Sequence, residues 1–319
     1  MAFSLFKFNW QKSPAHLLLL SEFLSPNEKQ KFIESDAWQS VLKQNPEKAI
    51  NRFIEEGMIE QAGISGMLNY KYKVTELKAW LKQLGLKVSG KKEELIERII
   101  AADEENIKRE TQGLTIYQCT EQSKIIAEQF QEKEREKRAH FEQKTYQALQ
   151  QNNFYEASQL VARFENGKVF PSNIGVDWKH YDSKRDVMLL KIMFNQKPKI
   201  LKNVNDDQMR ILRLAAGMML LWKYNDALKW LPQDFDLDLI MDKNSATNMI
   251  RAFAYHKEDM AQHRANKVKK IEINALDTAC DECKKMATKT YKLNQTPELP
   301  YEKCTSERGC YCTTMGLYF

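Results

Sequence analysis

Thirty consecutive residues, 122–151, contain neither glycine nor proline, and such a run predicts a single long helix. Its centre, Gln131–Arg138, mixes glutamate with lysine and arginine, so opposite charges stand three and four positions apart and support the helix locally. Asn152 and Asn153 should interrupt it before a second helix, Phe154–Phe164. Because the charges nearly cancel, a solvated connecting helix is favoured over a nucleic-acid-binding surface.

The composition favours helices in the rest of the chain as well. Only 11 glycines and 8 prolines occur among 319 residues, which is few for a turn-rich β protein, and the length suggests more than one folding unit. The apolar stretch 209–222 predicts a buried helix that forms the main core, followed by helices around Ala227–Trp230 and Ser245–His256. We therefore expect a mainly α, multi-domain helical protein.

Charge and hydropathy exclude a membrane protein. The apolar runs are short: Leu17–Leu20, for example, has four residues, whereas a helix that spans a bilayer needs about 20. The N-terminal apolar stretch also lacks the length and cleavage site of a signal peptide. We expect a cytoplasmic protein with no membrane partner. Its net charge of +6 permits a polyanionic partner without requiring one.

The first 70 residues carry helix-start signals at Ser25-Pro26 and Asn45-Pro46. In each pair the polar side chain can cap a helix and proline fits the first turn. After the second pair, apolar residues recur at helical spacing until Gly57, which should end the helix. The glycine-punctuated stretch that follows is also typical of a winged-helix wing, but a plain helical scaffold is the favoured interpretation.

Residues 74–100 predict two short helices joined by an extended link. Thr75 can cap the first helix, whose leucines share one face, and Gly85 follows where a left-handed residue would close it. Ser89 or Gly90 can cap the second helix, whose apolar residues face back toward the first. This arrangement clamps the two helices together.

The joint pattern resembles the SAP domain, a small helix-extended-helix module that binds DNA. It is carried by the Leu84-Gly85-Leu86 turn, the Ser89–Lys92 stretch and the closing Glu94–Ile99. The resemblance implies contacts to the sugar-phosphate backbone from Ser89, Gly90, Lys91 and Lys92. Arg98, two turns further along the second helix, is the candidate for an additional contact. Independently of the family, free N–H groups at a helix start beside ammonium groups form a phosphate site.

The charge of this segment also indicates binding to the phosphate backbone. Residues 71–101 contain eight Lys or Arg and four Glu, so binding should be backbone-led and salt-sensitive. The alternative is that Lys91 and Lys92 are solvated surface residues of a protein-interaction module. Trp80 is expected to pack against the preceding segment and not to stack on a base.

Five of the six cysteines cluster near the C-terminus. The candidate metal ligands are Cys280, Cys283, Cys304, Cys310 and Cys312. A Cys-x-x-Cys pair can reach one ion from a tight turn, and a second pair can complete a tetrahedron. We expect the first three with either Cys310 or Cys312, the latter preferred, to hold a structural zinc ion. A disulfide or redox pair and unligated buried thiols are the alternatives. Cys119, alone in sequence, is expected to pack as a small apolar residue.

The C-terminus also resembles a motif at the end of some phage head-morphogenesis proteins. The resemblance is carried by Cys280-x-x-Cys283, Pro297–Pro300 and Cys310-x-Cys312. It leaves a phage or mobile-element origin open. The lysines between the cysteines either form a basic surface that binds nucleic acid or are ordinary solvent-exposed residues.

No catalytic constellation is evident. The sequence has no glycine-rich phosphate loop, metalloprotease helix or nucleophile elbow. Four acidic residues could bind the metal ions of a nuclease, although a solvated loop is favoured: Asp234, Asp236, Asp238 and Asp242. The sequence thus predicts a non-catalytic DNA-binding protein whose C-terminal parts bind a protein partner or stabilise the fold. The alternative is a divergent metal-dependent nuclease or phage protein that the SAP-like module targets to DNA.

Five segments follow from these patterns. They are an N-terminal helical region (1–70), the SAP-like module (71–103), charged connecting helices (104–170), a helical core domain (171–270) and a cysteine-rich zinc knuckle (271–319).

Overall fold

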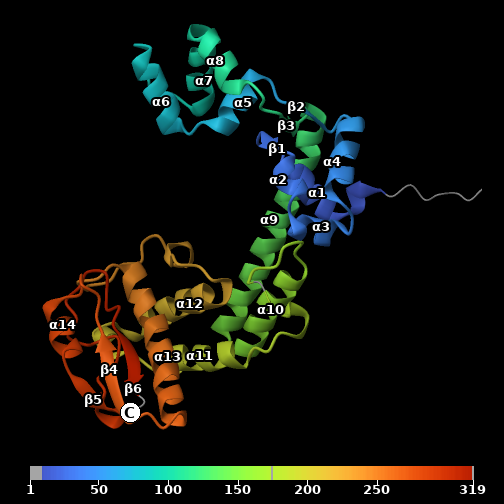
Figure 1. Cartoon of the computed structure of the whole chain (residues 1–319). Coiled ribbons are helices and arrows are strands. Elements are labelled where there is room, and N and C mark those ends of the chain that lie inside the picture. Colours follow the sequence, from blue (N-terminus) through green and yellow to red (C-terminus); the bar gives the residue numbers. More distant parts are fainter. Residues whose placement is uncertain (1–8, 174, 318–319) are drawn as a thin grey trace, which may run out of the picture. The chain divides into compact units, whose positions relative to one another are not determined.

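The computed structural model describes residues 9–173 and 175–317, and it divides the chain into two compact units, Met1–Lys137 and Arg138–Phe319 (Figure 1). Helices dominate both units, as the composition predicted. Among the helices of the described ranges, none is both long and apolar enough to cross a membrane.

The first unit begins with four helices and a small antiparallel sheet. The helices are α1 (Pro14–Ser21), α2 (Gln30–Ile33), α3 (Asp36–Leu42) and α4 (Pro46–Glu55), and the strands are β1 (Asn27–Glu28), β2 (Ile59–Gln61) and β3 (Ile116–Cys119). The sheet order is β1-β3-β2, with Ile59 opposite Cys119. Residues 62–115 are therefore inserted between two strands that are direct neighbours in the sheet.

The two predicted helix starts of this region have different outcomes. Asn45 caps α4 as expected, because its Oδ1 accepts the N–H of Glu47 at 2.8 Å. The helix predicted from Ser25-Pro26 is wrong, since β1 follows there and α2 begins only at Gln30. Pairing of Asn27 with Tyr117 in the sheet overrides the local signal.

The inserted segment contains four further helices with their own core. They are α5 (Ile64–Lys71), α6 (Val74–Gln83), α7 (Lys92–Ala102) and α8 (Glu104–Thr111). Their buried side chains form one apolar cluster: Leu68, Leu77, Trp80, Leu81, Leu95, Ile96, Ile99 and Ile107. The predicted two-helix module is thus extended at both ends, because α5 contributes Leu68 and α8 contributes Ile107.

The long central helix is confirmed. Helix α9 (Glu121–Gln150) runs for 30 residues, and α10 (Phe154–Asn166) follows. Asn152 lies between them with a φ of +56°, and the Asn153 side chain accepts the N–H of Glu156 at 3.2 Å. The two asparagines therefore end one helix and start the next, as the sequence indicated.

The second unit combines helices with a second three-stranded sheet. Its helices after α10 are α11 (Lys184–Asn195), α12 (Asp206–Trp222), α13 (Lys243–Ala265) and α14 (Asp281–Ala287), and its strands are β4 (Lys270–Asn274), β5 (Thr290–Lys292) and β6 (Thr313–Leu317). Both neighbours of β4 are antiparallel to it, in the order β5-β4-β6. Helix α12 is buried over most of its length, which confirms the predicted core helix.

The helix predicted around Ala227–Trp230 is wrong. Only a 3-10 turn, Leu228–Trp230, forms there. Lys223, with a φ of +57°, ends α12, and Pro232 soon follows, so the chain between them is too short for a regular helix. By contrast, α13 continues well beyond the predicted His256 to Ala265.

Burial in the second unit generates a stability prediction. Leu190 of α11 is 0% exposed and lies next to Gly217 of α12, whereas Leu228 is 52% exposed. Leu190→Ala should lower the free energy of unfolding by about 2–5 kcal/mol, because it leaves a cavity. Leu228→Ala is the matched control and should change it by no more than about 0.5 kcal/mol. Urea denaturation followed by tryptophan fluorescence measures both, and equal losses would contradict the described core.

Candidate nucleic-acid interface and candidate metal centre

The start of α7 is open to solvent. Lys91 occupies the N-cap position, and not Ser89 or Gly90, which corrects the predicted cap. The backbone bends at Gly90, where φ is +131°, directly before this N-cap position. No side chain caps the first-turn N–H groups, and Lys91 beside them is exposed. This is an arrangement that suits a phosphate oxygen.

Arg98 holds the link that leads into α7. Its Nη1 donates to the carbonyl of Lys87 at 2.7 Å, and its Nη2 lies 3.4 Å from Glu94 Oε2. Gly90 is packed beside this pair, because a Cβ at this position would collide with the Glu94 carboxylate and the Arg98 guanidinium. Glycine is favoured here for its φ, whereas the ends of the Glu94 and Arg98 side chains would have to shift to admit a Cβ. Arg98 is engaged within the protein and positions the link.

Lys92 is also engaged within the protein. Its Nζ donates to the carbonyl of Asn69 at 2.5 Å, at the C-terminal end of α5, and the residue is half-buried. The structure thus gathers all five predicted residues at one end of the module. Of the three cations among them, Lys91, Lys92 and Arg98, only Lys91 is exposed. Lys87, in the link, is exposed as well. Lys87 was not among the predicted contact residues, although its position in the basic link between the two helices indicates such a contact.

Helix α6 shows a second correction. It begins at Val74, and the backbone N–H of Lys73 donates to Glu76 Oε2 at 2.6 Å, so Thr75 is not the cap. The glutamate reaches back to the helix start and satisfies that donor. Trp80 is buried as predicted: its Nε1 donates to Asp103 Oδ2 at 2.8 Å, and its ring meets Tyr72 edge-on.

Comparison with known protein families matches residues 71–104 to the SAP domain. The chain contains a SAP domain. Such a domain indicates nucleic-acid binding in general. No curated protein and no solved structure matches the chain.

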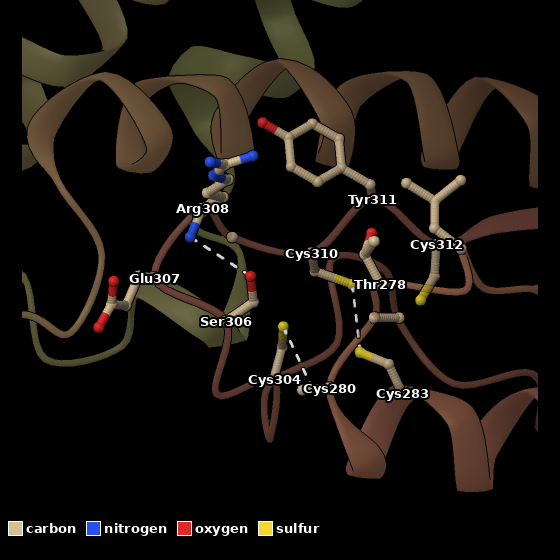
Figure 2. Close-up of a pocket in the computed structure, with 13 residues that line it drawn as sticks. Thr278, Cys280, Cys283, Cys304, Ser306, Glu307, Arg308, Cys310, Tyr311 and Cys312 are labelled. Atoms are coloured by element: carbon tan, nitrogen blue, oxygen red, sulfur yellow. Dashed lines mark hydrogen bonds between the residues drawn. The ribbon is translucent and has the colours of Figure 1, made fainter.

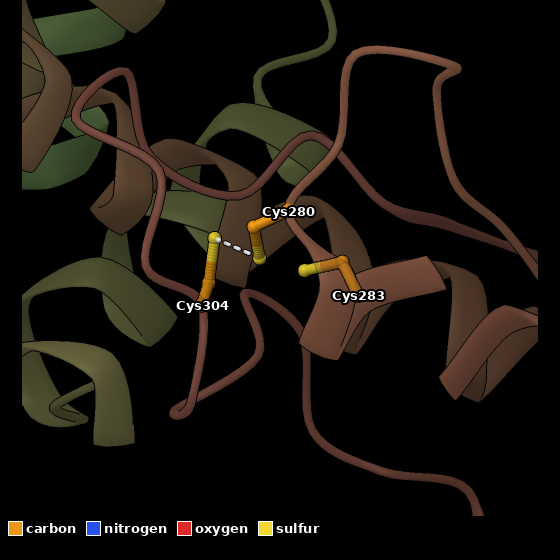
Figure 3. A group of neighbouring side chains, drawn as sticks. All are labelled: Cys280, Cys283 and Cys304. Atoms are coloured by element: carbon orange, nitrogen blue, oxygen red, sulfur yellow. Dashed lines mark hydrogen bonds between the residues drawn. The ribbon is translucent and has the colours of Figure 1, made fainter. Parts of the chain in front are cut away.

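Cysteines near the C-terminus form two groups of potential metal ligands. Cys280 precedes α14 and Cys283 lies in its first turn, while Cys304 comes from the loop after β5 and Cys310 and Cys312 immediately precede β6 (Figure 2). The sulfurs of Cys280, Cys283 and Cys304 lie within 4.8 Å of one another (Figure 3). Those of Cys283, Cys310 and Cys312 do so as well.

The sulfur–sulfur distances within the two sets fit metal ligation. The Sγ atoms of Cys280 and Cys304 are 3.8 Å apart, and those of Cys283 and Cys310 are 3.9 Å apart. A tetrahedral zinc site with Zn–S bonds of about 2.3 Å places its sulfurs about 3.8 Å apart. All five thiols are free. The donor set and its geometry can therefore hold a metal ion.

The surroundings shift the pKa values of the clustered thiols in opposite directions. Burial raises the pKa of the Cys283 thiol well above its usual range. Burial also raises the pKa of Cys280, but N–H donation from the Thr305 and Cys283 backbones outweighs it and lowers the pKa to about 6. Several thiolates crowded in a partly buried site repel one another, so a positive ion is needed to keep them deprotonated together.

The four aspartates of the nuclease alternative do not share a site. Asp242 caps α13, accepting the Ser245 N–H at 2.8 Å, while Asp234, Asp236 and Asp238 are exposed along a loop. Among the described residues, the groups with ligand atoms close enough for a metal are the two cysteine sets, and no aspartate belongs to them. Cys119 is buried on β3 with its Sγ 3.4 Å from the Leu20 carbonyl, as a lone packed thiol.

The conformation of Gly90 generates the prediction for this interface. Gly90→Ala should lower the free energy of unfolding of the SAP domain by about 1–3 kcal/mol, because alanine must adopt a disfavoured φ and meets Glu94 and Arg98. Gly63→Ala is the control, since Gly63 has a φ of −69° and no atom within 4 Å of an added Cβ. Hydrogen exchange of the α6 and α7 amides measures the loss. Equal protection in both variants would show that the link does not need glycine.

Proposed function

We propose that this protein is a non-catalytic DNA-binding protein that contacts the DNA backbone through its SAP domain and carries a structural zinc ion on its C-terminal cysteines. The observation that carries the DNA proposal is the uncapped first turn of α7 beside the exposed Lys91. Backbone N–H groups and an ammonium group that converge in this way recognise phosphate without reading the bases.

The local charges set the expected strength of binding. Lys87 and Lys91 add positive charge around the helix start, whereas Glu93 and Glu94 in its first turn oppose an anion. A site with few cations and nearby carboxylates binds modestly and is strongly weakened by salt. Arg98 contributes indirectly, because it holds the link that presents these groups.

Lys91→Gln tests the DNA proposal. It should weaken binding to a short fluorescein-labelled duplex several-fold and reduce the slope of log K against log salt by about 0.9, the value expected for one lost phosphate contact. Lys202→Gln is the control, since Lys202 is an exposed lysine of the second unit. Fluorescence anisotropy at several salt concentrations gives both quantities. If Lys91→Gln and the control bind alike, the SAP helix start is not the contact.

The zinc proposal names four ligands: Cys280, Cys283, Cys304 and Cys310. The 3.8 Å pair Cys280–Cys304 and the 3.9 Å pair Cys283–Cys310 support these ligands. Cys312 belongs to the same close set as Cys283 and Cys310 and is the alternative fourth ligand. Four thiolates fill a tetrahedral ion completely and leave no position for substrate, so the site would stabilise the fold. This agrees with a non-catalytic role.

Elemental analysis of the purified chain tests this site. We expect one equivalent of zinc per chain, lost in Cys283→Ser and Cys310→Ser and retained in Cys312→Ser. Cys119→Ser is the control and should keep its metal, because Cys119 lies in the first unit. Absence of zinc from the wild-type chain would refute the proposal. Loss in Cys312→Ser but not in Cys310→Ser would refute the ligand assignment.

The N-terminal region contains a three-stranded sheet, so the winged-helix alternative replaces the plain helical scaffold that the sequence favoured. We propose that it is a winged-helix fold with the SAP domain inserted where the wing would stand. In support, the last two strands, β2 and β3, flank the insertion, and the sheet order is β1-β3-β2. Helix α4 precedes β2 and follows α3 after a short turn at Lys43, whose φ is +54°. The winged-helix region then includes residues 116–119.

A further inference from the structure

A basic cleft lies beside the second sheet, apart from the cysteine cluster. It has a volume of about 520 Å³. Its lining comes from the end of α13 and from β4, β5 and the turn after β5: Arg264, Lys269, Lys270, Lys292, Leu293 and Asn294. Four of these six residues are cations, and all four are exposed. The cleft therefore presents concentrated positive charge on a concave surface.

Strand pairing forces two of the cations together. Lys270 on β4 is directly opposite Lys292 on β5, so their side chains leave the same face of the sheet. The Leu293 N–H donates to the Lys269 carbonyl at 3.1 Å, which fixes this register. Like charges directly opposite each other destabilise a sheet. Such a pair is relieved when an anion lies between the two ammonium groups.

The protein supplies little counter-charge of its own. Within residues 9–173 and 175–317, none of the four cations forms an ion pair with a carboxylate. Glu272, two positions beyond Lys270 on the same face of β4, is the nearest acid along this strand, and it stands opposite Thr290. Arg264 lies near the end of α13, where it also faces the negative end of the helix dipole. The net charge of the lining remains strongly positive.

We infer that this cleft is a second nucleic-acid contact, in which Arg264, Lys270 and Lys292 bind consecutive phosphates of the backbone. The inference rests on the proposed DNA-binding function and adds a site in the other unit. Arginine and lysine in an open, shallow surface recognise a chain of phosphodiesters without base specificity. Asn294 at the rim can donate its amide to a phosphate or sugar oxygen.

The test compares three variants of the full chain for binding to a fluorescein-labelled duplex. Lys270→Gln with Lys292→Gln removes two cleft charges, Lys179→Gln with Lys202→Gln removes two exposed charges elsewhere in the same unit, and Lys91→Gln reports on the SAP domain. We expect the cleft variant to weaken binding several-fold and to lower the salt slope by about 1.8, as two lost phosphate contacts require. The matched control should bind like wild type. Circular dichroism checks that each variant is folded.

The outcomes separate the two proposals. If Lys91→Gln weakens binding and the cleft variant behaves like its control, the cleft inference is overturned and the SAP proposal stands. If the cleft variant alone weakens binding, the cleft stands and the SAP contact falls. A chain that binds no duplex overturns both. Weaker binding of the cleft variant to phosphatidylserine vesicles, with unchanged DNA binding, would overturn the inference in favour of a lipid surface.

Discussion

The first unit depends on the antiparallel pairing of β2 with β3, two strands separated along the chain by residues 62–115. Closing a loop of this length costs entropy, but the cost rises only slowly with length. The inserted helices offset it with a core of their own, and Leu68 and Ile107 extend that core into the connecting helices. The N–H of Ala62 donates to the carbonyl of Ile116 at 2.8 Å. The two ends of the insertion are therefore joined by a hydrogen bond that continues the pairing of β2 with β3. The SAP domain can thus be carried without breaking the sheet.

Within the SAP domain, positive charges close in sequence have different physical roles. Arg98 binds the Lys87 carbonyl and Lys92 binds the Asn69 carbonyl, so both hold backbone in place. Lys91 has the exposed position beside the uncapped helix start. The two anchored side chains lie within α7, whereas Lys91 stands at its N-cap position directly after the bend at Gly90. A charge count of the segment cannot make this distinction.

Local signals in the sequence predicted the fold where the determining contacts are also local. The 122–151 run and the Asn45 cap depend on neighbours within one or two turns, and both predictions are confirmed. The helix at Ser25-Pro26 failed because its residues pair with a strand some ninety positions away along the chain. The cysteines were found from their spacing, yet the choice between Cys310 and Cys312 depends on sulfur positions that spacing leaves open.

The cysteine cluster and the basic cleft share the same short stretch of chain. Helix α14 carries Cys283 and connects β4 to β5, and its Met286 packs with Ile273 of β4 and Leu299. An ion held at the start of α14 would therefore fix the connection that keeps Lys292 opposite Lys270. Binding free energy at such a site is folding free energy for the elements around it. Whenever no anion is bound, the fold must resist the repulsion between the two paired lysines. A structural metal can therefore stabilise a phosphate-binding surface with which it makes no contact.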